Sequence, residues 1–340
     1  MNRRATPARW WLAWGGVAAA ALGALLLRLG GDVWWPVFPF LFGPRWIALP
    51  LLICPLPLLV TRPKAGVVPA GLTTVLVLAG ILGMRVGPAR LGLPPSGSPS
   101  FRLVEYNMAV STKVTHDILQ RLDSLGAQVA TLVECPSYSE VLRPPAGWNL
   151  RSAGELCFLS RFPIVGWDVR SQDDIYKLHG KLAIAKATIV IGGENVTIAL
   201  LHLKSPRDAL IEFRYPSAWP GLRTSVDSIS AIRNLESHLA IEFLSPAMNG
   251  PIIVAGDFNT PEESRIYSRW WSSFSDAFEE AGAGTGYSWH SRWHGIRIDH
   301  ILMNGGFAAR RTWIGPDLGS DHVPVIADLV LRPQRTRTAR

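Results

Sequence analysis

Residues able to bind a metal ion or transfer a proton recur at the ends of apolar runs in this chain. Asp321 and His322 stand side by side ahead of the strand-like run "VPVIADLVL". Similar positions hold a further set: Asn107, Glu134, His202, Asp257, Asn259 and Asp299. Sites in α/β sheets are built at strand ends. We therefore expect a site of oxygen donors suited to Mg²⁺ or Mn²⁺, with imidazoles suited to proton transfer. Each residue alone also has a structural explanation, such as capping a turn.

The elements that position these residues are short β-like runs alternating with a few helices. Strands are expected at 101–108, 129–135, 156–160, 181–191, 195–203, 251–259, 297–304 and 322–331. Amphipathic periodicity predicts helices over 114–126, closed by Gly126, and over 228–244. This alternation is typical of an α/β or α+β domain, and no repeat of fixed period is present.

Three apolar stretches precede this domain. Trp10 to Leu27 and Ala65 to Met84 carry no charge, and Val33 to Val60 carries only Arg45. Their lengths predict three membrane spans, although six prolines in the middle stretch favour a kinked or re-entrant segment there. A cleaved signal peptide would explain the first stretch but not the third. We assign residues 1–86 to a membrane anchor, 87–100 to a Pro/Gly/Ser linker, 101–331 to a catalytic domain and 332–340 to a basic tail.

The net charge of +8 belongs entirely to residues 1–100, which hold nine basic residues and one acid, Asp32. The domain over 101–331 has more acidic than basic residues, so a grip on nucleic acid through phosphate neutralisation is not favoured. Basic residues slightly favour a cytoplasmic amino terminus, which places the domain outside the cytoplasm. Cys135 and Cys157 could form a disulfide or remain two buried thiols, and buried thiols are the default.

Several motifs together resemble the endonuclease/exonuclease/phosphatase superfamily, whose members share the DNase I-like fold and hydrolyse phosphoesters with a divalent metal. The motifs occur in that family's order over residues 101–331: "EYNM", "LVEC", "LSRFPI", "LLHLKS", "VAGDFN", "SDAF", "RIDHILM" and "SDHVPV". The family usually has Gln before the Glu of "LVEC". The resemblance implies a four-layer sandwich of two mixed β-sheets flanked by helices.

The resemblance also implies roles for the residues at the strand ends. Asp257 would orient or deprotonate the attacking water, and Asn259 would hold a phosphate oxygen. His322 would bind the scissile phosphate or exchange its proton, with Asp299 fixing its tautomer and His202 as a second imidazole. Glu134 is the strongest ligand candidate for Mg²⁺ or Mn²⁺, with Asn107 and Asp321 joining directly or through water. Asp276 in "SDAF" is expected to form a turn or a helix cap.

Contacts to the rest of a substrate are expected from basic and aromatic residues. The segment from Lys204 to Ser225 contains Arg207 and Arg214, which can bind phosphate oxygens; it could also lie at the lipid interface or be an ordinary surface loop. Lys181 could touch phosphate or be an exposed strand lysine, and Trp289 could line a cleft or only pack.

The sequence thus predicts an integral membrane, metal-dependent phosphoester or phosphoanhydride hydrolase acting on a lipid-linked or small phosphate at the outer membrane surface. Its partners would be the bilayer and that substrate, and no protein partner is inferred. The three-span arrangement also looks like membrane phosphatases of this superfamily linked to glycopeptide resistance and lipid-carrier pyrophosphate. The alternatives are an endonuclease or exonuclease acting on DNA or RNA, with the same catalytic residues, and a catalytically silent membrane-tethered binding module.

Overall fold

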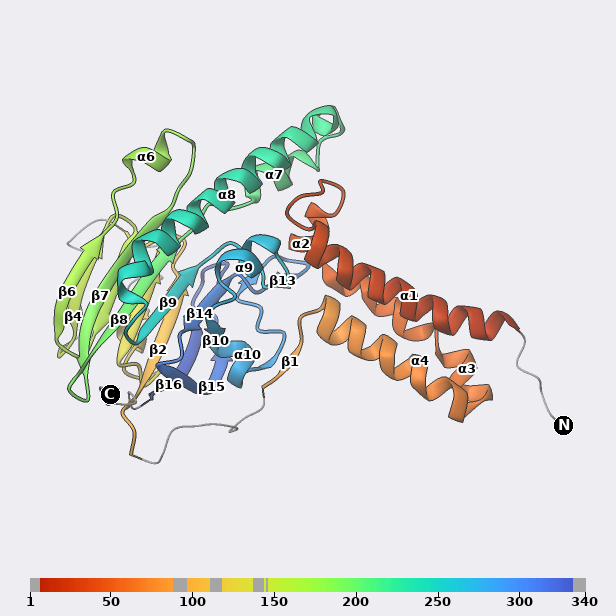
Figure 1. The fold of residues 1–340 in the computed structure, drawn as a ribbon, viewed down its shortest axis with the longest axis horizontal. Helices are drawn as coiled ribbons and strands as arrows, with labels where there is room; N and C mark the ends of the chain where they lie inside the picture. The colour runs from red at the N-terminus through yellow and green to blue at the C-terminus, as the bar shows by residue number, and fades with distance from the viewer. Residues whose placement is uncertain (1–6, 88–96, 111–117, 137–143, 145, 333–340) are drawn as a thin grey trace, which may run out of the picture.

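The computed structural model describes residues 7–87, 97–110, 118–136, 144 and 146–332, and two six-stranded mixed sheets dominate it (Figure 1). Each sheet has a single parallel strand pair, β2 with β3 in one and β8 with β9 in the other. The first sheet has the order β15 (Phe307–Ile314), β16 (Val325–Leu331), β2 (Ser100–Asn107), β3 (Val129–Val133), β5 (Leu156–Ser160), β4 (Asn149–Ala153). The second has the order β10 (Ser275–Asp276), β14 (Asp299–Met303), β9 (Ile252–Asp257), β8 (Glu194–His202), β7 (Ala183–Ile191), β6 (Ile164–Val169).

The two sheets face each other across a shared apolar core, to which both contribute alternate side chains, such as Leu103 from β2 and Ile198 from β8. A second cluster lies between the first sheet and the turn of helix at 118–121, and a third lies between the second sheet and two helices, α8 (Leu222–Leu244) and α9 (Arg265–Trp270). These four layers confirm the predicted fold class. All eight predicted strands are present, whereas β4, β6 and β15 were not predicted.

Shorter elements connect the layers. They are α6 (Asp173–Tyr176), α7 (Arg207–Glu212), α10 (Ala277–Ala281), the 3-10 turns η3 (Pro216–Gly221) and η4 (Ser245–Ala247), and the strands β11 (Ala283–Gly284), β12 (Trp289–His290) and β13 (Gly295–Ile296). The predicted helix over 228–244 is the longer α8, and the one over 114–126 is described only from residue 118.

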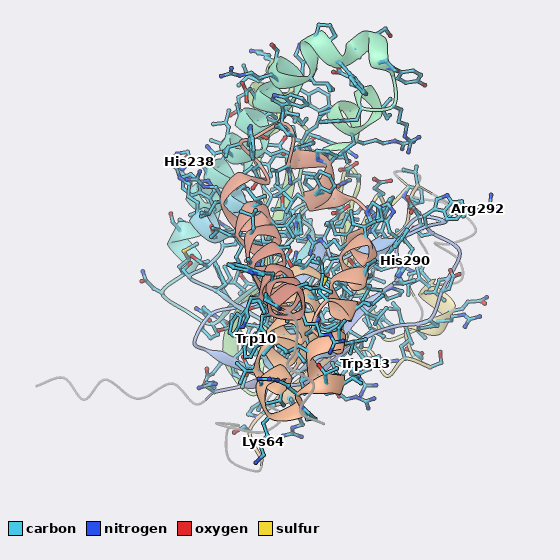
Figure 2. The ribbon with its side chains drawn as sticks, turned by 90° about the vertical axis from the view of Figure 1, so that its right-hand side faces the viewer. Trp10, Lys64, His238, His290, Arg292 and Trp313 are labelled. Atoms are coloured by element: carbon cyan, nitrogen blue, oxygen red, sulfur yellow. A yellow bond between two sulfur atoms is a disulfide. The ribbon has the colours of Figure 1, made fainter. Side chains whose placement is uncertain are left out.

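The amino-terminal segments, called the anchor below after their predicted function, form a bundle that projects from one end of the two-sheet domain (Figure 1). Its long helices are α1 (Pro7–Gly30) and α4 (Pro63–Val75), which continues as a π-helical turn, η2 (Leu76–Ile81). Both are long and apolar enough to cross a membrane. Figure 2, seen from the anchor end, shows them side by side in front of the domain, with Trp10 and Lys64 labelled.

The middle apolar stretch is a broken run of three short pieces: α2 (Phe38–Phe42), the 3-10 helix η1 (Arg45–Ile53) and α3 (Leu56–Thr61). Prolines stand at or next to every break, as expected where a ring removes a helical hydrogen bond. The run returns along the bundle from the end near the domain to the far end (Figure 1). The kinked form expected from the prolines is therefore present, and the count of three spans stays a prediction.

The bundle packs directly on the domain. Leu27, Phe38, Leu41 and Phe42 of the anchor share a buried cluster with residues of α7, α8 and the loop after β13, among them Val226 and Ile298. The short strand β1 (Arg85–Val86) pairs with β11, so the last residues assigned to the anchor join the domain. In the described residues, the anchor and the domain therefore share a buried apolar cluster and a strand pair.

Cys135 and Cys157 form a disulfide, so the default of two buried thiols is wrong. The bond joins the end of β3 to β5, which pair antiparallel with Leu132 opposite Cys157. The two sulfurs are close in space because Cys135 lies two residues after β3, at the edge where β5 begins. Propensity along the chain gives no information on such a pairing.

Asp276 is a helix cap, as predicted from "SDAF". Its carboxylate accepts hydrogen bonds from the backbone amides of Phe278 and Glu279 at the start of α10. It also pairs with Nδ1 of the buried His300 at 2.7 Å. Burial opposes the charged form, but the nearby Arg297 and the hydrogen bond from His300 hold the pKa of Asp276 well below its usual range.

We expect Asp276→Ala to destabilise the fold by about 2 kcal/mol, because it removes a cap and leaves Nδ1 of the buried His300 without its partner. For a domain of this size that corresponds to a fall of about 4 to 8 °C in the midpoint of thermal unfolding. Asp227→Ala, on the exposed surface of α8, should change the midpoint by less than about 2 °C. Equal midpoints for both variants would contradict the capping function.

Candidate active site

Three of the predicted site residues lie in one row across adjacent strands. Asp257, at the end of β9, is the register partner of both His202 on β8 and Asp299 on β14. Parallel β8 and β9 end at the same edge, and antiparallel β14 begins there, so the three side chains meet although 97 positions of chain separate His202 from Asp299. This explains why a "GDFN" motif and an "RIDHI" motif function together.

The row requires a glycine before Asp257. Gly256 has φ +151°, and a Cβ at this position would lie 2.0 Å from the carbonyl oxygen of Leu201 on β8. Any other residue would force β8 and β9 apart and displace Asp257.

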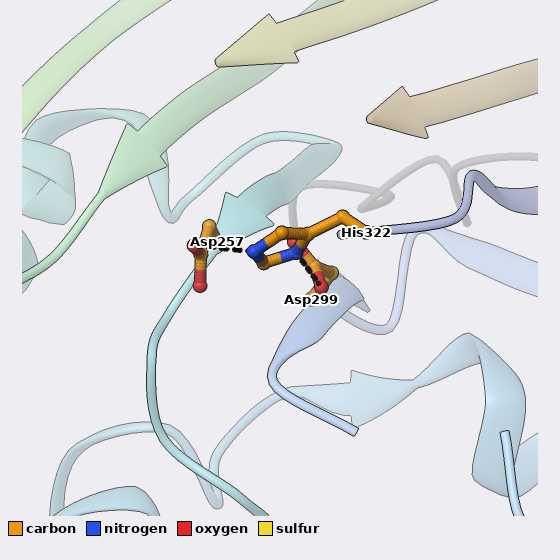
Figure 3. A group of neighbouring side chains, drawn as sticks. All are labelled: Asp257, Asp299 and His322. Atoms are coloured by element: carbon orange, nitrogen blue, oxygen red, sulfur yellow. Dashed lines mark hydrogen bonds and ion pairs between the residues drawn. The ribbon is translucent and has the colours of Figure 1, made fainter. Parts of the chain in front are cut away.

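Asp257 contacts three neighbouring side chains of the site, and Figure 3 shows one of them, His322. Its Oδ2 accepts a hydrogen bond from Nδ2 of Asn107 at 3.0 Å, and lies 3.6 Å from Nε2 of His202 and 3.8 Å from Nε2 of His322. Burial, followed by repulsion from Asp299, raises the pKa of Asp257. A buried carboxylate with a raised pKa next to two imidazoles is suited to accept a proton from water.

His322 is held by Asp299. Its Nδ1 donates to Oδ2 of Asp299 at 2.8 Å, which turns Nε2 toward Asp257 (Figure 3). Burial disfavours the imidazolium, yet the Asp299 carboxylate, helped by Asp257 and Asp321, raises the pKa of His322 to about 10. His322 therefore carries a positive charge near neutral pH and can bind an anion or donate a proton.

A second wall of the site comes from the other sheet and faces His202. Nδ1 of His202 pairs with Oε1 of Glu155 at 2.8 Å, and its Nε2 lies 3.7 Å from Oε1 of Glu134. Lys181 bridges the two carboxylates, with its Nζ 3.3 Å from Glu155 and 3.7 Å from Glu134. Glu134 follows β3 and Glu155 precedes the antiparallel β5, so the Cys135–Cys157 disulfide and the β3/β5 ladder hold both acids at one edge.

The oxygen donors on this wall fit a hard divalent cation. The contacts of Glu134 with described residues, at 3.7 Å, exceed hydrogen-bond length, so its carboxylate remains available to the cavity. Glu134 also has φ +52°, an unusual conformation for a residue with a side chain, and strained backbone of this kind gathers at functional sites. By contrast, the cluster Asp257, Asp299 and His322 already uses its Asp299–His322 contact as a hydrogen bond.

Eleven of the twelve predicted site residues line a single cavity of about 780 Å³: Asn107, Glu134, Lys181, His202, Arg207, Arg214, Asp257, Asn259, Trp289, Asp321 and His322. Asp299 lies behind His322, outside the lining. The side-chain amide of Asn259 donates one of its two protons to the carbonyl of Leu203. Asp321, exposed at the rim, accepts from Nε1 of Trp289 at 2.9 Å.

The loop that carries Asn259 is fixed from behind by Arg233 of α8. The buried Arg233 donates to the carbonyl of Asn259 and to Oγ1 of Thr260, both at 2.6 Å. Its other terminal nitrogen lies 3.5 Å from Asp32, which follows α1 of the anchor. Asp32 also accepts hydrogen bonds from Oγ of Ser264 and from the amide of Arg265 at the start of α9. A residue of the anchor is thus linked to the catalytic loop through one guanidinium.

Comparison with known proteins agrees with this geometry. The sequence model described as the Endonuclease/Exonuclease/phosphatase family matches residues 105–322. The chain belongs to this family. Family members are phosphoester hydrolases and generally use divalent metals, so the predicted resemblance and reaction class are confirmed at that level. No curated protein matches the sequence.

Solved structures show the same fold at low sequence identity. A humanised D. rerio TDP2 has a TM-score of 0.52 and 15% identity, covering 68% of this chain and 98% of its own. The family protein from Bacteroides vulgatus has a TM-score of 0.51 and 16% identity, covering 68% and 99%. That from Beutenbergia cavernae DSM 12333 has a TM-score of 0.50 and 16% identity, covering 69% and 72%. In each case the similarity is one of fold.

Some residues of the site were not predicted from the sequence. Glu155 was missed because no motif contains it. Asp321 and His322 also precede a strand but belong to "SDHVPV", whereas Glu155 joins the site only through the antiparallel pairing of β3 with β5. Arg233 appears in the sequence as an ordinary helix residue. Phe42 and His294, which also line the cavity, belong to segments whose meeting no local pattern shows.

We expect Glu155→Gln to weaken Mn²⁺ binding about 10- to 100-fold, the usual effect of losing a group in the shell around the ligands of a metal site. With Glu155 neutral, Lys181 would pair with Glu134 alone and compete with the cation. Titration of full-length protein with Mn²⁺, followed by the paramagnetic resonance of the free ion, measures this. Glu242→Gln, on the exposed side of α8, is the control, and equal affinities for the two variants would refute the assignment.

Proposed function

We propose that this chain is a membrane-anchored phosphatase that hydrolyses a phosphoester or phosphoanhydride of a lipid-linked or small phosphate at the outer membrane surface, with Mg²⁺ or Mn²⁺. The observation that carries the proposal is the composition of one cavity. Catalytic side chains of both sheets share it with Pro39, Phe42 and Gly43 of the apolar anchor. A soluble polymer such as DNA has no need of a membrane segment in the wall of its site.

The residues of the chain divide the chemistry between them. Asp257, with its raised pKa, would accept a proton from the attacking water. His322, charged and oriented by Asp299, would face the phosphate and stabilise the charge that develops on its oxygens. Bound at Glu134 with Asn107 and Asp321, the divalent cation would supply Lewis-acid stabilisation of the phosphate. Arg207 and Arg214, on the cavity wall, would bind further phosphate oxygens.

Two features support a location outside the cytoplasm. A disulfide joins Cys135 and Cys157, and such bonds persist in oxidising compartments. The connection between α3 and α4 lies at the end of the bundle far from the domain (Figure 1). Arg62 and Lys64 belong to this connection and the first turn of α4, in keeping with the predicted cytoplasmic side.

We expect full-length protein in detergent to release phosphate from alkyl phosphates with Mg²⁺ and to lose this activity in EDTA. Asp257→Ala and His322→Ala should each lower kcat by about 10² to 10⁴, the usual contribution of a proton-transferring group. His238→Ala, on the outer side of α8 (Figure 2), is the matched control and should retain parental activity. Full activity of both site variants would show that the assigned site is wrong, and an inactive parent protein would favour the binding module.

The nuclease alternative uses the same catalytic residues, so substrates must separate it. Plasmid DNA and an alkyl pyrophosphate are offered to the same preparation, with conversion of supercoiled to nicked DNA compared with phosphate release. We expect phosphate release to dominate, since the described domain has no net basic charge for gripping a duplex. Efficient nicking without phosphate release would overturn the proposed function.

The compartment is tested through the two cysteines. We expect protein denatured without reductant to be alkylated at Cys54 alone, and at all three cysteines after reduction. Mass spectrometry of the peptides measures this. Alkylation of Cys135 in unreduced protein taken directly from cells would contradict the oxidising location.

A further inference from the structure

The active-site cavity has two chemically different ends. Acids and imidazoles surround Asp257, while another part of the lining, called the apolar end below, is rich in apolar side chains: Pro39, Phe42, Leu210, Ile211, Ile296 and Ile298. Phe42, Ile296 and Ile298 belong to one buried cluster against which Leu210 packs, and Arg207 and Arg214 stand next to Leu210 and Ile211 in the chain and also line the cavity. At about 780 Å³ the cavity is large enough for a ligand of drug-like size, far beyond a phosphate group. The apolar end therefore has room for a further part of the substrate.

The apolar end is built jointly by the anchor and the domain. Its anchor side is held by hydrogen bonds that cross between them. Nε2 of His294 contacts the carbonyl of Phe42 at 3.0 Å, and Nε1 of Trp46 donates to the carbonyl of Trp293 at 3.0 Å. The buried Arg45, three residues after Phe42, pairs with the buried Glu263 at 2.7 Å. These contacts hold Phe42 in the lining of the cavity.

Helix α7 forms the opposite side and also leads to the membrane segments. Leu210 and Ile211 line the cavity, and Phe213, directly after α7, packs against the rings of Trp35 and Phe38 of the anchor. Ile211 is 37% exposed, so the wall is open to its surroundings there. The exposed aromatics Trp34, Tyr215 and Trp219 lie in the same anchor turn and the segment after α7, and such residues favour the bilayer interface.

We infer that this apolar end is a subsite for the hydrocarbon chain of the substrate, so that the enzyme takes a phosphate or pyrophosphate of a long apolar chain. The phosphate binds at the catalytic end, and the first carbons of its chain lie between Phe42 and Ile211. The chain leaves beside α7 and the turn before α2, directly into the region of the spanning helices. The inference rests on the proposed phosphatase function and deepens it by assigning residues of the anchor to substrate selection.

Photolabelling tests the subsite without catalysis. Full-length protein in lipid nanodiscs is labelled with a non-hydrolysable decyl phosphonate that carries a diazirine on its chain, and the labelled peptides are mapped by mass spectrometry. We expect label in peptides containing residues 39–43 and 207–214, removed by excess octyl phosphonate and by inorganic phosphate. Label confined to the lipid-facing sides of α1 and α4, and unaffected by phosphate, would overturn the inference.

Kinetics with butyl, hexyl and octyl phosphate provide a second measurement. Burial of each added CH₂ should raise kcat/KM roughly fourfold until the subsite is filled. We expect Ile211→Asn to flatten this dependence on chain length, while Val165→Asn, a matched change on the exposed face of β6, keeps the parental dependence. Equal kcat/KM for the three chains in the parent would refute the subsite and leave the phosphatase function intact.

The two proposals fail in different ways. If no alkyl phosphate is hydrolysed while DNA is nicked, the phosphatase function is wrong, and the competed photolabel still decides whether the apolar end binds a chain. If alkyl phosphates are hydrolysed but no competed label appears at 39–43 or 207–214, only the subsite is wrong.

Discussion

The reaction centre depends on the hydrogen-bonded register of β8, β9 and β14, which sets His202, Asp257 and Asp299 in one row. Side chains alternate between the faces of a strand, so a slip of one residue in β9 would turn Asp257 away from both partners. The register in turn requires the close approach of β8 and β9 at Gly256. The opposite sheet contributes Asn107, whose amide reaches Asp257 across the interior. Correct packing of the two sheets is therefore a condition for the contact between amide and carboxylate.

Buried charged residues connect the two sheets to the anchor. Arg233 is fully buried, and burial lowers its pKa, although Asp32 and Glu236 oppose this. A buried charge is costly unless paired, and removal of one partner is usually more damaging than exchange of the whole pair for apolar residues. Asp32 thus has two functions: it satisfies backbone amides of α9, and it balances the guanidinium that holds the Asn259 loop. The anchor and the Asn259 loop are therefore coupled: Arg233 holds the loop, and Asp32 of the anchor balances the charge of Arg233.

Much of this architecture could be predicted from local pattern. Strands such as β3, β8 and β9 are largely buried, so their apolar runs are evident, and Glu134, His202 and Asp257 at or just after their ends indicate the site. The edge strand β4 was missed because its side chains are half-exposed or exposed, and β15 because two arginines interrupt its pattern. Glu155, the disulfide and the Phe42 wall depend on which segments become neighbours, and that information lies in tertiary packing. Residues of the candidate site were predicted where a single sequence motif contains them, and were missed where they join the site only through a second segment of the chain.

Asp32, which follows α1, accepts hydrogen bonds from the backbone amides at the start of α9 and so seats α1 directly on the domain. In the proposed topology, the catalytic end then has a fixed height above the bilayer and a fixed tilt. Encounters with a lipid phosphate would occur by lateral diffusion within one plane, so turnover would follow the number of substrate molecules per unit area of membrane. Dilution of the surrounding solution would leave that surface density unchanged, whereas dilution with other lipids would slow the enzyme.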